Sequence, residues 1–116
     1  METRFECEIE ERERIMIFKL RGNLDVGTIS SVMTHVDSLI ATHYQQKFLF
    51  DCNDLMHIDS SGVGAIIVLF KRVRSKKGDM KMLHLKGQPK DLFDLLRLDR
   101  VFEMYDNLDR AIESFR

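Results

Sequence analysis

The chain has 116 residues, 44% of them hydrophobic and 32% charged, so we expect one domain with its own core over residues 1–116. Its 18 basic and 19 acidic side chains are interspersed and give a net charge of −1, which provides no strong attraction to nucleic acid or to an anionic membrane. The N-terminus lacks the apolar segment of a signal peptide, and no apolar run is long enough to span a membrane, so we expect a cytoplasmic protein.

The first part of the chain predicts an antiparallel hairpin with one face in water. Apolar and polar residues alternate over residues 5–10 and again over 16–21, which is typical of half-buried strands. A polar turn at 11–13 should join the strands, and Gly22 should end the second. Cys7 and Cys52 lie in strand-like segments without a paired spacing, so we expect two buried, reduced thiols.

A helix should follow the hairpin after a short link at residues 23–25. From 29 to 44, apolar residues recur every three or four positions, as on a helix that covers one side of a sheet. Asp25 or Thr28 is the expected N-cap, because both side chains can accept a bond from a free backbone N–H. The apolar stripe consists of Ile29, Val32, Met33, Val36, Leu39, Ile40 and Tyr44.

The middle of the chain joins its most apolar strand to its most apolar helix. Residues 47–52 include three consecutive apolar residues, which predicts a central strand covered on both faces, and the turn formers Asn53 and Asp54 should end it. The helix should run from Ser61 to about Lys77, with Gly78 as its C′ residue. Its stripe consists of Val63, Ile66, Ile67, Leu69, Phe70 and Val73.

The last third predicts two strands and two helices. Residues 80–85 should form a strand, and Pro89 suits the first turn of a helix whose apolar face carries Leu92, Phe93, Leu95 and Leu96. Residues 100–105 should form a short strand with Val101, Phe102 and Met104 inside. Asp106 or Asn107 should cap a final helix with Leu108, Ala111, Ile112 and Phe115 on one side. This order predicts an α/β sandwich with a mixed sheet of four to five strands and about four helices, mainly on one face.

The sequence lacks the usual signs of catalysis or of a bound cofactor. Its four histidines are dispersed without metal-ligand spacing, and Gly62 and Gly64 belong to neither of the common phosphate-binding glycine motifs. A hydrolase using Ser60 and His57 would need an orienting acid and an oxyanion hole as well. The basic run at 71–77 spreads around its helix and complements the negative end of the helix dipole. We therefore expect no enzyme, metal or cofactor.

Residues 58–64, Ile-Asp-Ser-Ser-Gly-Val-Gly, connect the central strand to the central helix. Two hydroxyls lie where a helix leaves its first N–H groups unpaired and its dipole is positive. An Asp or Ser N-cap is the commonest use of such residues. A cap alone does not explain the second serine and the two glycines.

Here the sequence resembles the STAS domains of bacterial anti-sigma factor antagonists. Asp51, followed eight residues later by Asp59-Ser60-Ser61-Gly62-Val63-Gly64, is similar to the family signature. Residues 22–25 resemble the family's Gly-x-Leu-Asp, and residues 90–94 its Leu-Phe helix. Asn23 stands where the family often has an acid, and Arg97 where a small residue is frequent.

The resemblance implies that Ser60 is phosphorylated by a serine kinase that is itself an anti-sigma factor, and that a serine phosphatase reverses the reaction. Val68 lies about 140° from Val63 on the helical wheel, so we expect it on an exposed face beside Gly64, Ala65 and Arg72. We expect the partner to bind a surface made of Asp25, Asp59, Ser60, Ser61, Gly62, Val63, Gly64 and Val68.

The alternative interpretation is a non-switching STAS module that binds a nucleotide or scaffolds a signalling complex. In either case we expect no direct contact with nucleic acid or membrane, and a monomer or weak homodimer.

Overall fold

The computed structural model describes residues 4–43 and 46–116, so Tyr44, which we placed on the first helix, lies outside the described residues. Within them, five strands form one mixed sheet in the order β1-β2-β3-β4-β5. These strands are β1 (Glu6–Arg12), β2 (Ile15–Leu24), β3 (Lys47–Ile58), β4 (Asp79–Leu83) and β5 (Met104–Tyr105). β1 is antiparallel to β2, and every other neighbouring pair is parallel.

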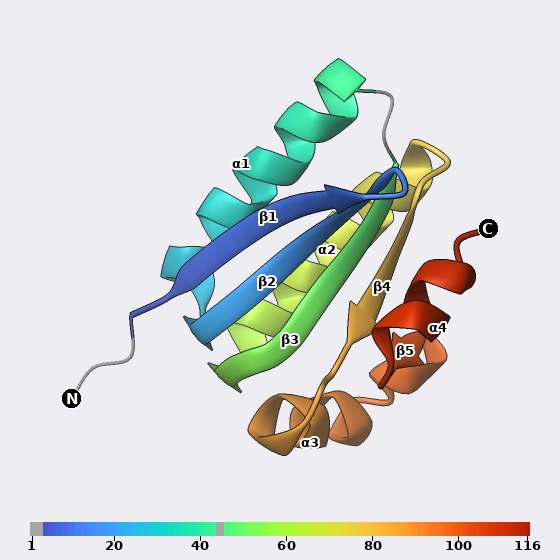
Figure 1. Cartoon of the computed structure of the whole chain (residues 1–116). Helices are drawn as coiled ribbons and strands as arrows, with labels where there is room; N and C mark the ends of the chain where they lie inside the picture. Colours follow the sequence, from blue (N-terminus) through green and yellow to red (C-terminus); the bar gives the residue numbers. More distant parts are fainter. Residues whose placement is uncertain (1–3, 44–45) are drawn as a thin grey trace.

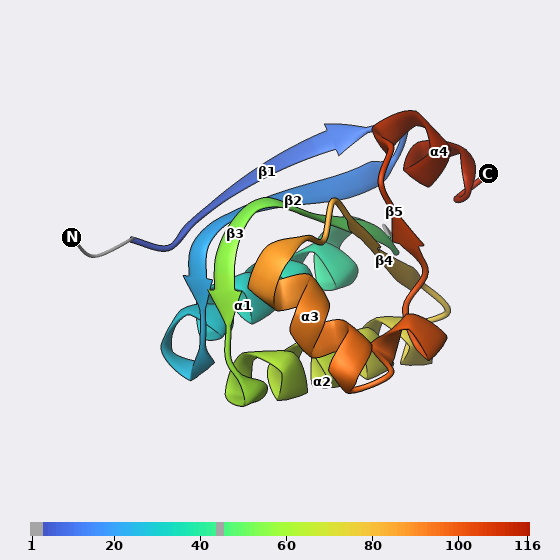
Figure 2. The same cartoon turned by 90° about the horizontal axis from the view of Figure 1, so that it is seen from below.

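The helices lie mainly on one face of this sheet. α1 (Val26–His43) and α2 (Ser60–Ser75) cover that face side by side, and α3 (Gly87–Leu95) lies across the carboxyl end of β3 (Figures 1 and 2). α4 (Leu108–Glu113) packs on the opposite face, beside β4 and β5. The predicted α/β sandwich with a mixed sheet and helices mainly on one face is confirmed.

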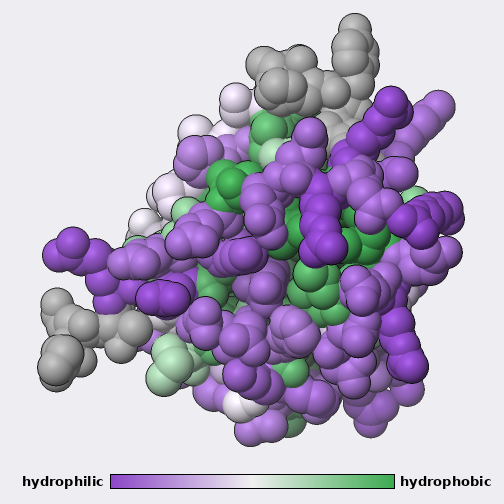
Figure 3. Space-filling model, in the orientation of Figure 1, coloured by the Kyte–Doolittle hydropathy of each residue, from purple (hydrophilic) through white to green (hydrophobic). Residues whose placement is uncertain are grey.

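Two groups of buried side chains hold these layers together. The larger lies under α1 and α2 and includes Phe18, Phe48 and Phe50, with the rings of Phe18 and Phe50 stacked at 5.2 Å. The smaller lies under α4 and consists of Ile15, Ile17, Leu49, Leu83, Ala111 and Ile112. β3 is therefore covered on both faces, as predicted. The face toward the viewer in Figure 3, opposite α1 and α2, is mostly hydrophilic.

The hairpin differs from the prediction in its turn and in its exposure. The turn lies at Glu13 and Arg14, whose φ angles of 51° and 67° are typical of the tight two-residue turns that join antiparallel strands. Ile15 and Ile17 are buried under α4, so the second strand is not solvated along one whole face. The helix that covers these two residues is distant in the sequence, so the local alternation of apolar and polar residues does not indicate their burial.

Two strands are longer than predicted. β2 continues past Gly22 to Leu24, and β3 passes through Asn53 and Asp54 to Ile58. Their pairing shifts register between Lys19 and Arg21 and again between Gly22 and Asn23, so β3 accommodates extra residues as bulges. The turn-forming residues that suggested a strand end lie in this irregular stretch of a continuous strand.

The region after α3 is where the predicted apolar faces fail. Leu95, Leu96 and Val101 are 76%, 46% and 45% exposed. α3 ends at Leu95, Arg97 adopts a left-handed φ of 59°, and a 3-10 turn covers Leu98–Arg100. Leu98 and Phe102 are the buried residues here, and the last strand shrinks to Met104–Tyr105. Asn107 caps α4, as one of the two predicted caps, by accepting a bond from the Arg110 N–H at 3.0 Å.

The C-terminal end of α2 also differs from the prediction. The left-handed residue is Lys77, with φ 65°, while Gly78 donates its N–H to the Val73 carbonyl at 3.0 Å. Gly78 is needed for space, because a Cβ there would lie 2.5 Å from the Gln46 carbonyl oxygen.

Both cysteines are free, as predicted, although only Cys52 is fully buried and Cys7 is half-buried. Burial, with a smaller effect from Glu8, raises the pKa of Cys7 to about 11.

Candidate functional site

Ser60 opens α2 at the end of the central strand. Asp59 has an extended backbone, and its Oδ1 accepts a bond from the Gly62 N–H at 2.7 Å, which makes it the N-cap. The Val63 N–H bonds to the Asp59 carbonyl at 3.0 Å, so the N–H groups of Ser60 and Ser61 precede the first intrahelical bond. The helix starts one residue earlier than the predicted Ser61, because the cap is the aspartate.

The first turn of α2 rests directly on the end of β2. The Asp59 N–H points to the Leu24 carbonyl oxygen at 3.4 Å. A Cβ on Gly62 would lie 2.6 Å from that oxygen and 3.0 Å from Cγ1 of Ile58, so no larger residue fits without moving the backbone. Gly62 therefore sets how closely α2 approaches the sheet.

The same contact brings the start of α1 beside the start of α2. Asp25 follows Leu24 and caps α1, its Oδ1 accepting bonds from the N–H groups of Gly27 at 2.9 Å and Thr28 at 3.0 Å. The Thr28 hydroxyl accepts in return from the Asp25 N–H at 2.9 Å. Both predicted cap residues thus take part, in a reciprocal arrangement typical of helix starts.

The predicted partner-binding residues divide into an exposed and a buried group. Ser60, Ser61 and Gly64 are exposed, Val68 is 48% exposed, and nothing lies within 4 Å of a Cβ built on Gly64. Gly62 and Val63 are buried, so they shape the helix start and offer no side chain to a partner. In the part of the chain that the structure describes, the Ser60 hydroxyl makes no hydrogen bond. Exposure alone does not distinguish Ser60 from Ser61.

The structure adds residues to this end of the molecule that the sequence did not suggest. Val26 is 71% exposed at the start of α1, and Met56 is 63% exposed near the end of β3. A hollow of about 660 Å³ opens between β2, β3 and α3, with Met56 and Pro89 in its lining. Gln88 of α3 binds the backbone of Ile58. The sequence contains little or no indication that these residues belong to the site, because a lone exposed valine or methionine is common.

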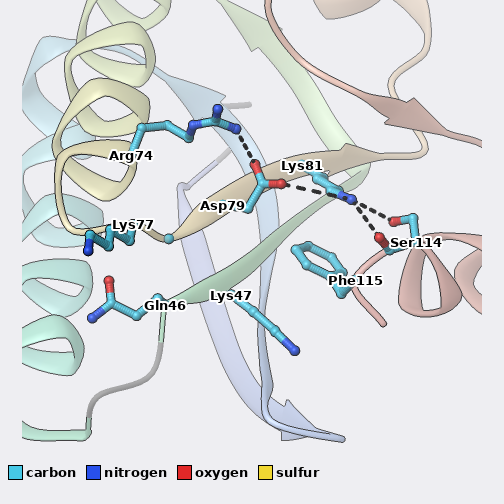
Figure 4. Close-up of a pocket in the computed structure, with 9 residues that line it drawn as sticks. Gln46, Lys47, Arg74, Lys77, Asp79, Lys81, Ser114 and Phe115 are labelled. Carbon is cyan, nitrogen blue, oxygen red and sulfur yellow. Dashed lines mark hydrogen bonds and ion pairs between the residues drawn. The ribbon is translucent and has the colours of Figure 1, made fainter.

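The opposite end of the sheet carries a cationic hollow of about 440 Å³ (Figure 4). Lys81, only 3% exposed, donates from its Nζ to the carbonyl and the hydroxyl of Ser114, both at 3.0 Å. Arg74 pairs with Asp79 at 3.4 Å. The hollow lies at the carboxyl-terminal ends of α2 and α4, where cations complement the helix dipoles. The C-terminal end of α2 therefore fits the interpretation that the basic run at 71–77 complements the helix dipole.

Arg72, which we expected beside Val68, pairs with Asp37 of α1 at 2.8 Å. Its guanidinium thus ties α1 to α2.

Residues 4–43 and 46–116 show no arrangement of side chains typical of a metal site or of a serine hydrolase. No group of three or more His, Cys, Asp or Glu side chains in this range could hold a metal ion. No hydrogen bond there joins His57 to Ser60. None of the helices described is long and apolar enough to cross a membrane.

Comparison with known proteins identifies the family. The family model for the STAS domain matches residues 6–111. The chain belongs to the STAS domain family. The resemblance found in the central motif is thereby confirmed.

The STAS domain has relatives of similar length. The anti-sigma F factor antagonist of Paenibacillus polymyxa is 28% identical over 107 residues, which cover 92% of each protein. An anti-sigma factor antagonist from Mycobacterium paratuberculosis has a TM-score of 0.82 at 15% identity, over 96% of this chain and 93% of that one.

The anti-sigma factor antagonist SpoIIAA has the same fold in two states. Its unphosphorylated form has a TM-score of 0.75 at 18% identity, over 97% of this chain and 98% of that one. The phosphorylated form, from Bacillus, has a TM-score of 0.73 at 19% identity, over 97% and 100%. At these identities the solved structures show the shared fold.

Proposed function

We propose that this STAS domain, as a single domain over residues 1–116, is an anti-sigma factor antagonist that switches partners. In its unphosphorylated form it binds an anti-sigma factor that is also a serine kinase. Phosphorylation of Ser60 by that kinase releases the complex, and a serine phosphatase restores binding. The domain itself contributes no catalytic residue.

The observation that carries this proposal is the position of Ser60, exposed at the first residue of a 16-residue helix. The hydroxyl is free of hydrogen bonds within the described residues, so a kinase can reach it without breaking a contact of the fold. The relative named anti-sigma F factor antagonist and the two states of SpoIIAA support the same assignment.

The physical basis of the switch is electrostatic. A phosphoserine adds about −1.5 to −2 charges and three acceptor oxygens. The domain tolerates this charge because the unpaired N–H groups and the dipole of α2 favour an anion at that end. A partner surface fitted to a neutral hydroxyl would instead bury an unpaired charge, which costs several kcal/mol and about a thousandfold in affinity.

Partner contact should extend from Ser60 along the exposed side of α2. Gly64 leaves the helix backbone open to close approach, and Val68 lies one turn further along. Asp25 and Asp59 act from the adjoining caps, where Asp59 fixes the loop and assists the kinase. A small apolar spot with polar surroundings suits a modest, reversible contact.

The test is to isolate the protein from its own cells, map its phosphate by mass spectrometry, and recover its partner with and without that phosphate. We expect phosphate on Ser60 and loss of the partner from the phosphorylated form. Ser60→Ala should keep the partner, and Ser60→Asp should weaken binding with nearly unchanged thermal stability. Phosphate confined to Ser61 or to a distant residue would overturn the assignment.

A further inference from the structure

The end of β3 next to Ser60 has no strand partner on one side. β4 pairs with β3 only over Lys47–Asp51, whereas β3 continues to Ile58, directly before Asp59 and Ser60. On this side the backbone of Ile58 therefore needs another partner for its N–H and C=O groups.

The side chain of Gln88 supplies both bonds. Its Nε2 donates to the Ile58 carbonyl oxygen at 2.8 Å, and its Oε1 accepts from the Ile58 N–H at 2.9 Å. The primary amide thus pairs with the strand as a neighbouring backbone would. A backbone donor and a backbone acceptor together fix the orientation of the amide, since a flipped amide would face like with like.

The first turn of α3 holds Gln88 in place from both sides. Gly87 has a left-handed φ of 59°, and Pro89 is buried, with its φ fixed by its ring. Gln88 therefore extends from a stiff segment toward Ile58, 30 positions earlier in the chain.

The opposite side of this strand end is held by β2. Asp59 donates to the Leu24 carbonyl, and Gly62 packs against the same carbonyl and the buried side chain of Ile58. The residue that precedes the N-cap of α2 is therefore fixed between Leu24 on one side and Gln88 on the other.

We propose that Gln88 is a positioning residue that presents Ser60 to its kinase by clamping Ile58. This inference rests on the proposed phosphorylation of Ser60. Removing the clamp does not alter the Ser60 hydroxyl itself, but it lets the end of β3 move. Ser60 is then correctly positioned for the kinase for a smaller fraction of the time. The loss should appear as a raised KM and as phosphate shared with Ser61, with a smaller change in kcat.

The test compares the wild type with two variants. Gln88→Met keeps the length of the side chain and loses both hydrogen bonds. Gln88→Glu keeps the acceptor and places a negative charge against the Ile58 carbonyl oxygen. Each purified protein is incubated with extract of its own cells and labelled ATP. Initial rates at several protein concentrations, with a fixed amount of the same extract, give KM and the kcat of each variant relative to the wild type, and mass spectrometry gives the ratio of phosphate on Ser60 to that on Ser61. Hydrogen exchange reports the amides of Ile58 and Gly62.

We expect both variants to fold, to raise KM about tenfold, to lower the Ser60 to Ser61 ratio, and to exchange the Ile58 amide at least tenfold faster. Ser114→Ala, which removes a bond to Lys81 at the other end of the sheet, is the control for general loss of stability and should leave KM and the ratio unchanged. If Gln88→Met does not fold, Gln88→Asn, with the same amide on a shorter chain, takes its place.

The outcomes separate the two proposals. Wild-type protein without phosphate on Ser60 would overturn the proposed function. If the wild-type protein is phosphorylated on Ser60 and the Gln88 variants keep its KM and its Ser60 to Ser61 ratio, the positioning role of Gln88 alone is overturned, whatever their exchange rates.

Discussion

The two glycines that follow the serines should respond in opposite ways to the same substitution. A methyl group on Gly62 would lie 2.6 Å from the Leu24 carbonyl oxygen, while one on Gly64 meets nothing within 4 Å. We predict that Gly62→Ala destabilises the domain and that Gly64→Ala stabilises it. Each variant is the matched control for the other, because both sit in α2, two positions apart.

The magnitudes follow from packing and helix propensity. Overpacking costs about 1–3 kcal/mol, and contact with a backbone atom that cannot rotate away favours the upper end. Replacing glycine by alanine in a helix returns about 1 kcal/mol. Gly62→Ala should therefore lose about 2 kcal/mol net, and Gly64→Ala should gain about 1 kcal/mol.

Thermal unfolding followed by circular dichroism measures this difference. An unfolding entropy of about 2.1 cal/mol/K per residue implies that each kcal/mol shifts the Tm of this 116-residue chain by about 4 °C. We expect Tm to fall by about 8 °C for Gly62→Ala and to rise by about 4 °C for Gly64→Ala. If Gly62→Ala melted at or above the wild type, the close approach of α2 to Leu24 would not be what requires glycine there.

Three further predictions concern other parts of the chain. Val68→Asp should change stability by no more than about 0.5 kcal/mol, as is usual on a surface, while weakening partner capture; unchanged capture would place the interface elsewhere. Lys81→Met should lower Tm by about 8 °C, because the loss of the charge-assisted hydrogen bonds to Ser114 costs about 2 kcal/mol, while the control Lys47→Met should change Tm little. Equal Tm values for the two variants would contradict this. Iodoacetamide at pH 8 should modify Cys7 slowly, because burial raises the pKa of its thiol to about 11 and keeps it protonated, and it should modify Cys52 only on unfolding. Equal rates of modification of the two cysteines in the native protein, measured by mass spectrometry, would count against this.

The order of elements was predictable because each one has a local pattern that its buried face requires. The run Phe48–Phe50 indicated a strand covered on both faces, and both faces are covered. The capped start of α2 was predictable for the same reason, since Asp59 and Gly62 are neighbours in sequence and in space. Where pattern and packing coincide, the sequence alone is sufficient.

The features that escaped prediction depend on contacts between distant segments. β3 continues through Asn53 and Asp54 because it stays paired with β2, where Arg21 faces Asp54. Leu95 and Leu96 fit a helical stripe, yet the chain turns at Arg97 before they can be covered. Gln88 reaches Ile58 across 30 residues, and nothing in its local sequence distinguishes it from a surface glutamine.

The seating of α2 on β2 has a consequence for timing. Asp59, Gly62 and the Leu24 carbonyl hold the first turn against the sheet, so under the proposed function a phosphate added to Ser60 would require no slow rearrangement of this domain. The delay between phosphate transfer and release would then equal the residence time of the partner alone. If the proposed function holds, the state of the switch would be stored in one phosphate ester and would last until a phosphatase hydrolysed it.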